Sequence, residues 1–278
     1  MPVVAMTHEM GSLARDVALE LAAQLGLKSI QHEVGDLIAE RMHVPKSLIR
    51  RLREGKAGLL EKFKVDEGSE AIFTAEEVLT IASEGDVVIR GWGATCLLRP
   101  VPHIPCVRVT RSVENRVRWL MENLDLDDPE TALHEIRRSD RTHAARMHER
   151  FSVTWGDPVL YDLTLNTDRV SIESCVTQIS HLLSRPEFQE TPETRATLEN
   201  MTLEAHVRAA LRGDTATHEV RVTIVADGSS VTMKGIVVSQ LERDAVKRVA
   251  SAVPGVTEVD DQLKLMAGSK MFPSSKYS

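Results

Sequence analysis

The chain has 278 residues, of which 42% are hydrophobic and 27% are charged, a mixture typical of folded soluble proteins rather than disordered or fibrous ones. This length favours one large and one small domain. The formal net charge of -7 argues against a nucleic-acid partner, because the molecule as a whole repels polyanions.

The three cysteines, Cys96, Cys106 and Cys175, form no Cys-x-x-Cys pair. The sequence therefore indicates neither a zinc site nor a disulfide framework, and it predicts buried thiols in a reducing compartment. The first residues lack the features of a signal peptide, and no later apolar run reaches membrane-spanning length. We expect a cytoplasmic protein without a transmembrane segment.

The first elements alternate between strand and helix patterns. An apolar run over residues 2–7 predicts a strand, and apolar residues then recur at helical spacing up to Gly26. Residues 33–42 and 47–63 have helical patterns as well, the second interrupted by Gly55 and Gly58. Thr74 and Glu77 have the spacing of a capping box, which predicts that the next helix begins at Thr74 and ends near Gly85.

The middle of the chain continues the alternation. Strands are predicted over 86–90, 106–110 and 160–166, and helices over 113–124, 128–150 and 172–183. The long helix opens with Asp128 as N-cap and Pro129 at its first position. Strands separated by helices predict a parallel sheet covered on both faces, that is, an α/β domain over residues 1–184.

The character of the sequence changes over residues 185–202, where prolines stand among glutamates and threonines, and we interpret this stretch as a linker. Beyond it, the patterns predict helix, strand, strand, helix and strand over 203–266, a small α+β domain in the order α-β-β-α-β. Asp227-Gly228 predicts a hairpin turn, and Ser239 with Glu242 predicts a capping box. The tail 267–278 has the composition of a disordered segment.

A strand, a glycine turn and a helix together make a geometry that binds phosphate, since free N–H groups at the helix start face the anion. Residues 9–16, Glu-Met-Gly-Ser-Leu-Ala-Arg-Asp, occupy such a turn. Only one glycine and no lysine are present, whereas the standard phosphate-binding loop has two glycines and a lysine. From these residues alone, an ordinary strand-to-helix turn is the better interpretation.

Several segments together resemble the cytidylate kinase-like family. The opening Thr-His-Glu-Met-Gly-Ser-Leu-Ala-Arg-Asp of residues 7–16 is similar to that family's Ser-Arg-Glu-x-Gly-Ser-Gly-Gly-Arg-Glu, and Trp-Gly-Asp-Pro-Val-Leu-Tyr-Asp-Leu-Thr-Leu-Asn-Thr of residues 155–167 is similar to its closing motif. The C-terminal pattern resembles a BON domain in element order and in Gly235 and Gly255. The resemblance implies a P-loop NTPase-like three-layer domain followed by a BON-like domain.

By that resemblance Gly11, Ser12, Arg15 and Asp16 bind the phosphates of ATP, with Arg15 as a catalytic cation where a lysine usually stands. Mg²⁺ is implied as well, but its ligands stay unassigned, because Val17 occupies the position after Asp16 and has no oxygen. Leu13 and Ala14 replace two glycines of the family motif, which weakens the prediction of catalysis.

By the same resemblance the helix over 128–150, which also carries Arg146 and Arg150, is the lid of a monophosphate kinase. The resemblance implies catalytic roles for Arg137 and Arg141 and substrate contacts for Arg138 and Asp140. The alternative is a solvated helix face on which these residues pair with neighbouring carboxylates. The resemblance also implies an acceptor site that includes Glu33, Arg90 and Gly91, the last two at a strand end. For Arg90 and Gly91 the alternative is a tight turn beside a buried Trp92.

Two functions follow from the resemblance. The first is a nucleotide kinase-like enzyme that transfers the γ-phosphoryl group of ATP to a nucleoside monophosphate such as CMP, or to a similar small acceptor. The second is an inactive nucleotide-binding module coupled to a BON-like domain that binds a protein or a phospholipid. The replacements at residues 13, 14 and 17 favour the second function, and the retained Gly11, Ser12 and Arg15 favour the first.

Overall fold

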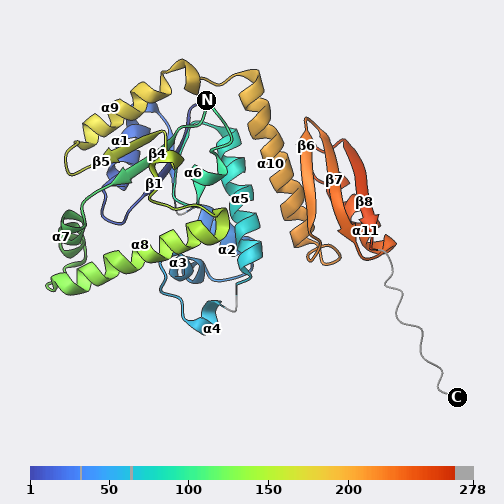
Figure 1. Ribbon diagram of the computed structural model, residues 1–278, viewed down its shortest axis with the longest axis horizontal. Helices are drawn as coiled ribbons and strands as arrows, with labels where there is room; N and C mark the ends of the chain where they lie inside the picture. Colours follow the sequence, from blue (N-terminus) through green and yellow to red (C-terminus); the bar gives the residue numbers. More distant parts are fainter. Residues whose placement is uncertain (32, 63–64, 267–278) are drawn as a thin grey trace. The chain divides into compact units, whose positions relative to one another are not determined.

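The computed structural model describes residues 1–31, 33–62 and 65–266, and the chain divides into two units, one ending at Thr202 and one beginning at Leu203. The first unit is built on a five-stranded parallel sheet in the order β2-β3-β1-β4-β5 (Figure 1). Its strands are β1 (Val3–His8), β2 (Lys28–Ile30), β3 (Val87–Arg90), β4 (Cys106–Thr110) and β5 (Leu163–Asn166).

Helices cover both faces of this sheet, which confirms the predicted three-layer α/β architecture. Helices α1 and α9 share a core with alternate residues of β1, β3, β4 and β5, while α5 and α6 lie against β3 and β1. The helices are α1 (Ala14–Leu25), α2 (Glu33–Arg41), α3 (Lys46–Arg53), α4 (Leu59–Lys62), α5 (Glu67–Glu84), α6 (Ala94–Leu97), α7 (Val113–Leu124), α8 (Pro129–Phe151) and α9 (Ile172–Leu183), with short 3-10 turns at Pro158–Leu160 and Pro186–Phe188.

The strand sequences explain why this sheet is central. Residues Val3 to Met6 are at most 2% exposed, β3 is apolar until its last residue, and β4 is apolar except for Arg108 and its last residue. Parallel strands buried on both faces have continuous apolar runs of this kind. Polar residues begin where the strands end, at His8, Arg90 and Thr110. The carboxyl ends of the three neighbouring strands therefore bring polar side chains to one edge of the sheet.

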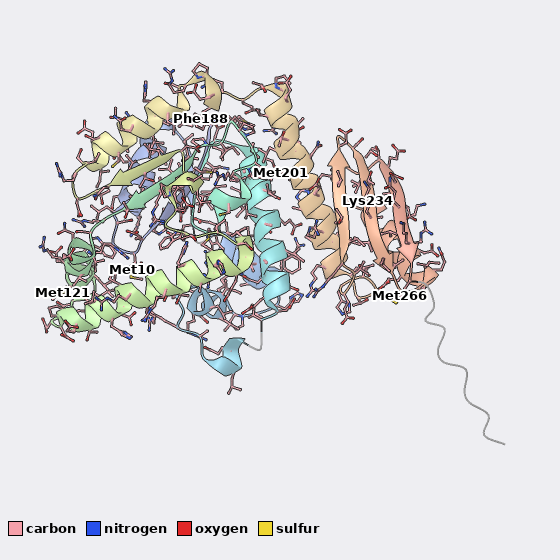
Figure 2. All side chains as sticks on the ribbon, viewed as in Figure 1. Met10, Met121, Phe188, Met201, Lys234 and Met266 are labelled. Carbon is pink, nitrogen blue, oxygen red and sulfur yellow. The ribbon has the colours of Figure 1, made fainter. Side chains whose placement is uncertain are left out.

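A smaller core joins helices α7 and α8. Leu120, Ala132 and Ile136 are buried in it, and Met10 and Met121 pack against it (Figure 2). Met10 belongs to the turn between β1 and α1. The two helices are thereby packed against that turn as well as against each other.

The predicted start of one helix in this unit was wrong. Helix α5 begins at Glu67, because Asp66 accepts a hydrogen bond from the Ser69 amide at 2.8 Å and caps it there. Thr74 is inside the helix, and its hydroxyl donates to the Glu70 carbonyl at 2.6 Å.

The helical stretch predicted over 47–63 is divided into α3 and α4, with Gly55 at a φ of 68° between them, which confirms the interruption predicted at Gly55 and Gly58. Its predicted last residue, 63, lies outside the described residues. Strand β2 was not predicted, because three residues are too short for a recognisable alternation.

The second unit has the predicted order α-β-β-α-β, from α10 (Pro192–Gly213) through β6 (Val222–Asp227), β7 (Ser230–Val237) and α11 (Gln240–Ser251) to β8 (Glu258–Leu265). Strands β6 and β7 are antiparallel, and β7 and β8 are parallel. Apolar residues of α10 and α11 cover one face of this sheet. The capping box is confirmed, since the Glu242 amide donates to Ser239 Oγ at 3.1 Å. The predicted disordered tail lies outside the described residues.

The stretch interpreted as a linker is largely helical. Pro186 opens a 3-10 turn, and Pro192 opens α10, which continues without a break to Gly213. Proline fits the first position of a helix, where its missing N–H has no partner to lose. The same prolines that suggested a linker therefore start helices here. None of the helices within the described ranges is both long enough and apolar enough to cross a membrane.

The first half of α10 belongs to the first unit, and we predict that this unit is unstable without it. Leu198 is 1% exposed, and the Thr202 hydroxyl donates to the Leu79 carbonyl at 3.4 Å. The free energy of unfolding of a fragment of residues 1–191 should be at least about 2 kcal/mol lower than that of a fragment of residues 1–202, because the shorter fragment lacks a buried leucine. Urea denaturation followed by circular dichroism measures the difference; equal midpoints would contradict it.

Candidate active site

The turn between β1 and α1 leaves the amide groups at the start of α1 open. Leu13 precedes the helix with a φ of 60°, and its side chain makes no capping hydrogen bond. Ser12 is 1% exposed, and its hydroxyl has no hydrogen-bond partner among the described residues. The first amides of a helix attract anions when no side chain caps them. The turn thus offers N–H groups and one unsatisfied hydroxyl.

A buried arginine on α7 fixes this turn. Arg116 is 2% exposed, and its Nε donates to the Met10 carbonyl at 2.8 Å. Its Nη1 and Nη2 donate to the two Asp140 carboxylate oxygens on α8 at 3.0 Å and 2.6 Å. The guanidinium therefore connects the turn, α7 and α8.

Close packing of α7 against the turn also explains why residue 11 is a glycine. Its φ is 78°, and a Cβ atom there would lie 3.1 Å from the Trp119 ring and 3.2 Å from the Arg116 carbonyl oxygen. Both neighbours belong to α7. Close approach of this helix, together with the positive φ, explains the glycine.

Glu9 ties the turn to β4. One of its carboxylate oxygens accepts from Arg108 Nη2 at 2.6 Å, and the other accepts from the Thr110 hydroxyl at 2.7 Å and from the Arg111 amide at 3.3 Å. These bonds satisfy a carboxylate that is largely shielded from water. Glu9 is therefore fully engaged within the fold.

The motif over residues 155–167 also joins strands. Trp155 Nε1 donates to the Thr7 hydroxyl at 3.1 Å, and the Trp155 carbonyl accepts from Arg108 at 2.8 Å and from Tyr161 at 2.6 Å. Asp162 accepts from the Cys106 amide at 2.7 Å, and the Thr167 hydroxyl donates to the Ser12 carbonyl at 2.9 Å. These contacts give the motif a structural role beside the turn.

Five basic side chains gather at the carboxyl edge of the sheet, and we call them the edge cluster: His8, Arg53, Arg90, His143 and Arg146. The Arg53 guanidinium lies 3.3 Å from the centre of the Trp92 ring, and Arg146 donates to the Leu52 and Arg53 carbonyls at 2.8 Å and 3.3 Å. The His143 ring lies 4.3 Å from the Trp155 ring. Helices α3 and α8 thereby bring cations to the ends of β1 and β3.

The members of the edge cluster shift one another's pKa values. Burial, then Arg90 and Arg53, lowers the pKa of His8 to about 3. Burial, then His8 and nearby arginines, lowers the pKa of His143 to about 3. Burial also lowers the pKa of Arg90 to about 10, and it lowers that of Arg53 well below its usual value, with help from Arg146 and Arg150. The edge of the sheet therefore has a strongly positive potential.

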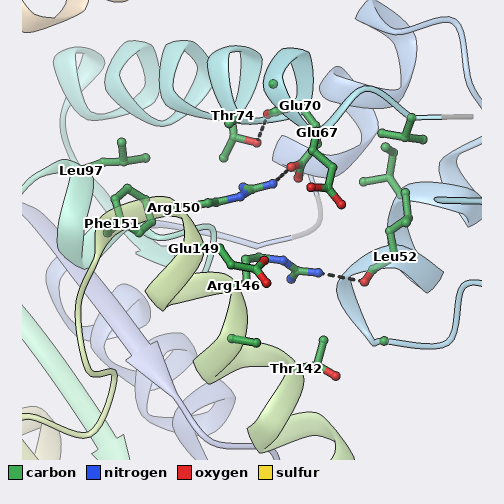
Figure 3. A pocket seen from close by; sticks show the side chains of 16 residues that line it. Leu52, Glu67, Glu70, Thr74, Leu97, Thr142, Arg146, Glu149, Arg150 and Phe151 are labelled. Carbon is green, nitrogen blue, oxygen red and sulfur yellow. Dashed lines mark hydrogen bonds and ion pairs between the residues drawn. The ribbon is translucent and has the colours of Figure 1, made fainter. Parts of the chain in front are cut away.

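A pocket of about 590 Å³ adjoins the edge cluster, between α3, α5, α6 and α8 (Figure 3). Arg150 reaches across it to Glu70, and Arg146, Glu67 and Glu149 supply further charge. Apolar side chains such as Leu97 and Phe151 complete the wall. Volume and lining are those of a site for a small molecule that has both polar and apolar parts.

The structure brings some of the sequence-predicted residues together. Arg90 is 7% exposed, and Arg15 lowers its pKa while Asp16 and Glu33 raise it, so these four charges lie within electrostatic reach of one another. A Cβ atom on Gly91 would lie 4.0 Å from Arg53 Nη2. The predicted phosphate turn and the predicted acceptor residues thus share one edge of the sheet.

The predicted lid residues have other surroundings. Arg137 and Arg141 are exposed on α8, and Arg141 Nε donates to the Arg137 carbonyl at 3.2 Å. Arg138 pairs with Glu135, as the solvated-face interpretation expects, and Asp140 pairs with Arg116. None of these four lines the pocket. Their roles in catalysis and substrate binding remain predictions.

Sequence reasoning did not assign Arg53, His8 or His143 to the site, and it included Arg146 and Arg150 only among the arginines of the predicted lid. A signal existed for three of them, because residues 143, 146 and 150 have the spacing of one helix face. Arg53 and His8 gave no such signal. Within the described ranges, no group of three or more His, Cys, Asp or Glu side chains is arranged to hold a metal ion.

We predict that Arg116→Met destabilises the first unit by about 3–5 kcal/mol, because it leaves Asp140 and the Met10 carbonyl without their buried partner. Urea denaturation measures the loss. Arg118→Met on the same helix is the matched control, since Arg118 is exposed, and it should change the free energy of unfolding by less than about 0.5 kcal/mol. Similar values for the two variants would contradict the role of Arg116.

We predict that stability falls on acidification because His8 and His143 are held neutral. Their pKa values are about 3 in the folded protein against 6.5 ordinarily, so between these values the unfolded chain binds more protons. Each histidine then removes up to about 1.4 kcal/mol per pH unit as the pH drops below 6.5. Thermal melts from pH 6.5 to 5 should show a shallower decline for His143→Gln than for the wild type. Replacing the exposed His148 of α8 in the same way should leave the decline unchanged.

Comparison with known proteins agrees with this geometry. The family model described as the cytidylate kinase-like family matches residues 3–169, and the BON domain model matches residues 201–267. A comparison with curated proteins found no match. Among solved structures, an uncharacterized protein from Eubacterium ventriosum is similar at 20% identity and a TM-score of 0.53, covering 66% of this chain and 100% of its own. This likeness shows the fold of the first unit.

Two further solved structures are similar at lower scores. Shikimate kinase from Bacteroides thetaiotaomicron has 18% identity and a TM-score of 0.41, over 66% of this chain and 99% of its own. The YorR protein from Bacillus subtilis, solved in complex with phosphorylated GDP, has 11% identity and a TM-score of 0.40, over 68% and 99%. Because the family model spans more than half of its residues, this chain belongs to the cytidylate kinase-like family, with a BON domain after the kinase-like unit.

Proposed function

We propose that the kinase-like unit transfers the γ-phosphoryl group of ATP to a nucleoside monophosphate such as CMP, or to a similar small acceptor. The observation that carries this proposal is the edge cluster, whose positive charge lies beside the uncapped start of α1. Phosphoryl transfer depends mainly on cations that hold and neutralise phosphate oxygens. Donor and acceptor phosphates would meet where the two features adjoin.

The turn before α1 has groups that fit the donor. The open amides of residues 13–16 and the Arg15 side chain suit the phosphates of ATP, whereas the Ser12 amide donates to the Glu9 carbonyl at 3.2 Å. The unsatisfied hydroxyl of Ser12 and the carboxylate of Asp16 are the oxygen ligands that this turn offers to Mg²⁺. When bound, the metal would neutralise charge that develops on the phosphates.

The pocket beside the edge cluster fits the acceptor. Its volume of about 590 Å³ suits a small molecule, and its apolar wall suits a base or sugar ring. Arg53 and Arg90 would hold the anionic end of the acceptor, since neither forms an ion pair with a carboxylate among the described residues. Cations without partners are available to a ligand.

The alternative function is nucleotide binding without transfer, coupled to the BON domain. Leu13 has a φ of 60°, a conformation that costs a non-glycine residue about 1–2 kcal/mol, and its side chain stands where the family motif has glycine. The BON domain exposes Ile236, Val238 and Leu241 at 62%, 65% and 81%, apolar surface that would suit a protein or phospholipid partner.

Turnover with a panel of nucleoside monophosphates, ATP and Mg²⁺ tests the proposal. We predict diphosphate product with at least one acceptor, lost in Arg15→Ala and reduced at least about 100-fold in kcat/KM by Arg53→Gln, because each removes a cation from a phosphate. Arg50→Gln is the matched control, since Arg50 is exposed on the same helix as Arg53. ATP binding without product on any acceptor would support the alternative, and turnover that persists in Arg15→Ala would contradict the donor assignment.

A further inference from the structure

The edge cluster holds polar atoms that the fold leaves without partners. His8 Nδ1, His143 Nε2 and Arg90 Nε are enclosed, and none has a hydrogen-bond partner among the described residues. An unsatisfied buried polar atom costs about 1–3 kcal/mol. Three such atoms in one cluster indicate a site whose partner is a ligand rather than another part of the fold.

The charges around the two histidines are of one sign. Arg90 and Arg53 face His8, and Arg53, Arg108 and Arg146 face His143 from α3, β4 and α8. Glu9 pairs with Arg108, and more distant carboxylates act on other members: Asp16 and Glu33 on Arg90, and Glu67 and Glu149 on Arg146. No carboxylate is among the groups that act on either histidine. The positive potential at these histidines therefore favours an anion.

An anion bound beside His8 and His143 would change the protonation equilibrium of their imidazole rings. Without it, the arginines repel a third positive charge, and both imidazoles stay neutral near pH 7. A dianion would offset the arginine charges and favour the protonated rings, each of which then donates a charge-assisted hydrogen bond. Ligand binding and proton uptake are linked by necessity in such a site.

We propose that His8 and His143, together with Arg53, Arg90 and Arg146, form a dianion site that takes up protons as a phosphate-monoester dianion binds. The inference rests on the proposed function in one respect, because the acceptor's phosphate is the ligand that this function would place there. It adds that acceptor affinity rises as the pH falls.

Sulfate is the probe, because it stays dianionic from pH 5 to 8, so any change in bound protons on binding occurs on groups of the protein. Calorimetric titration at pH 7 in two buffers of different ionisation enthalpy measures the protons bound. We expect an uptake of between one and two protons, and a sulfate affinity that increases at least about tenfold per pH unit on acidification, as linkage requires for one or more protons.

Variants identify the groups. His8→Gln and His143→Gln should each lower the uptake by about one proton, whereas His148→Gln, at an exposed histidine of α8, should leave it unchanged. Ring resonances of ¹⁵N-labelled histidine in the wild-type protein give a readout that does not depend on any variant folding. Two histidine pKa values should rise on addition of sulfate.

Failure of sulfate to bind, binding without proton uptake, or an uptake that is unchanged in both His8→Gln and His143→Gln would overturn the inference. The proposed function is tested separately, because sulfate binding needs neither ATP nor turnover. If sulfate binding is linked to proton uptake but the protein has no kinase activity, the inference stands and the proposed function is rejected. If the protein turns over but sulfate binding does not depend on pH, the proposed function stands and the inference is rejected. Competition against sulfate distinguishes the two sources of the phosphate group. If CMP displaces sulfate at lower concentration than inorganic phosphate does, the site belongs to an acceptor; if both displace it at the same concentration, the site belongs to a free anion.

Discussion

The buried guanidinium of Arg116 is the interaction on which the arrangement of the candidate site depends. A charge this enclosed is tolerated only if its donors are satisfied, and the Met10 carbonyl and the Asp140 carboxylate together satisfy them. The same bonds fix α8 relative to the turn that precedes α1. Helix α8 in turn carries His143 and Arg146 to the ends of β1 and β3. One ion pair thereby fixes both the turn before α1 and the helix that carries part of the edge cluster.

Much of the fold could be predicted, because the decisive signals are local. Continuous apolar runs identified the main strands, and Asp128-Pro129 identified the start of α8, where Asp128 accepts hydrogen bonds from two amides. The errors arose where two local signals compete. Asp66 caps α5 before Thr74 can, and Pro192 starts a helix in a stretch whose composition suggested a linker. Residue spacing alone cannot decide where either helix starts, because packing against the rest of the unit determines which of the possible start residues is used.

The candidate site was only partly predictable, for a related reason. The turn over residues 9–16 and the residues at the end of β3 follow from strand ends, which are local features. Burial of a charged side chain is not local. Glu9 finds Arg108 at a separation of 99 residues, and Arg53 meets Trp92 and Arg146 only after three elements have packed together. A sequence pattern places Arg53 on the basic, solvated face of a helix, and tertiary packing makes it a buried cation.

The distribution of carboxylates shows why the centre of the edge is positive. Glu9 neutralises Arg108 and Glu70 neutralises Arg150, whereas Arg53 and Arg90 have no ion-pair partner among the described residues. Apolar side chains in their place would avoid the desolvation cost, and a carboxylate beside them would offset it. Cations without a paired carboxylate leave a positive potential at this edge of the sheet. An arrangement that costs stability in the empty protein in this way is explained by a bound anion, which supplies the missing negative charge and the missing hydrogen-bond acceptors together.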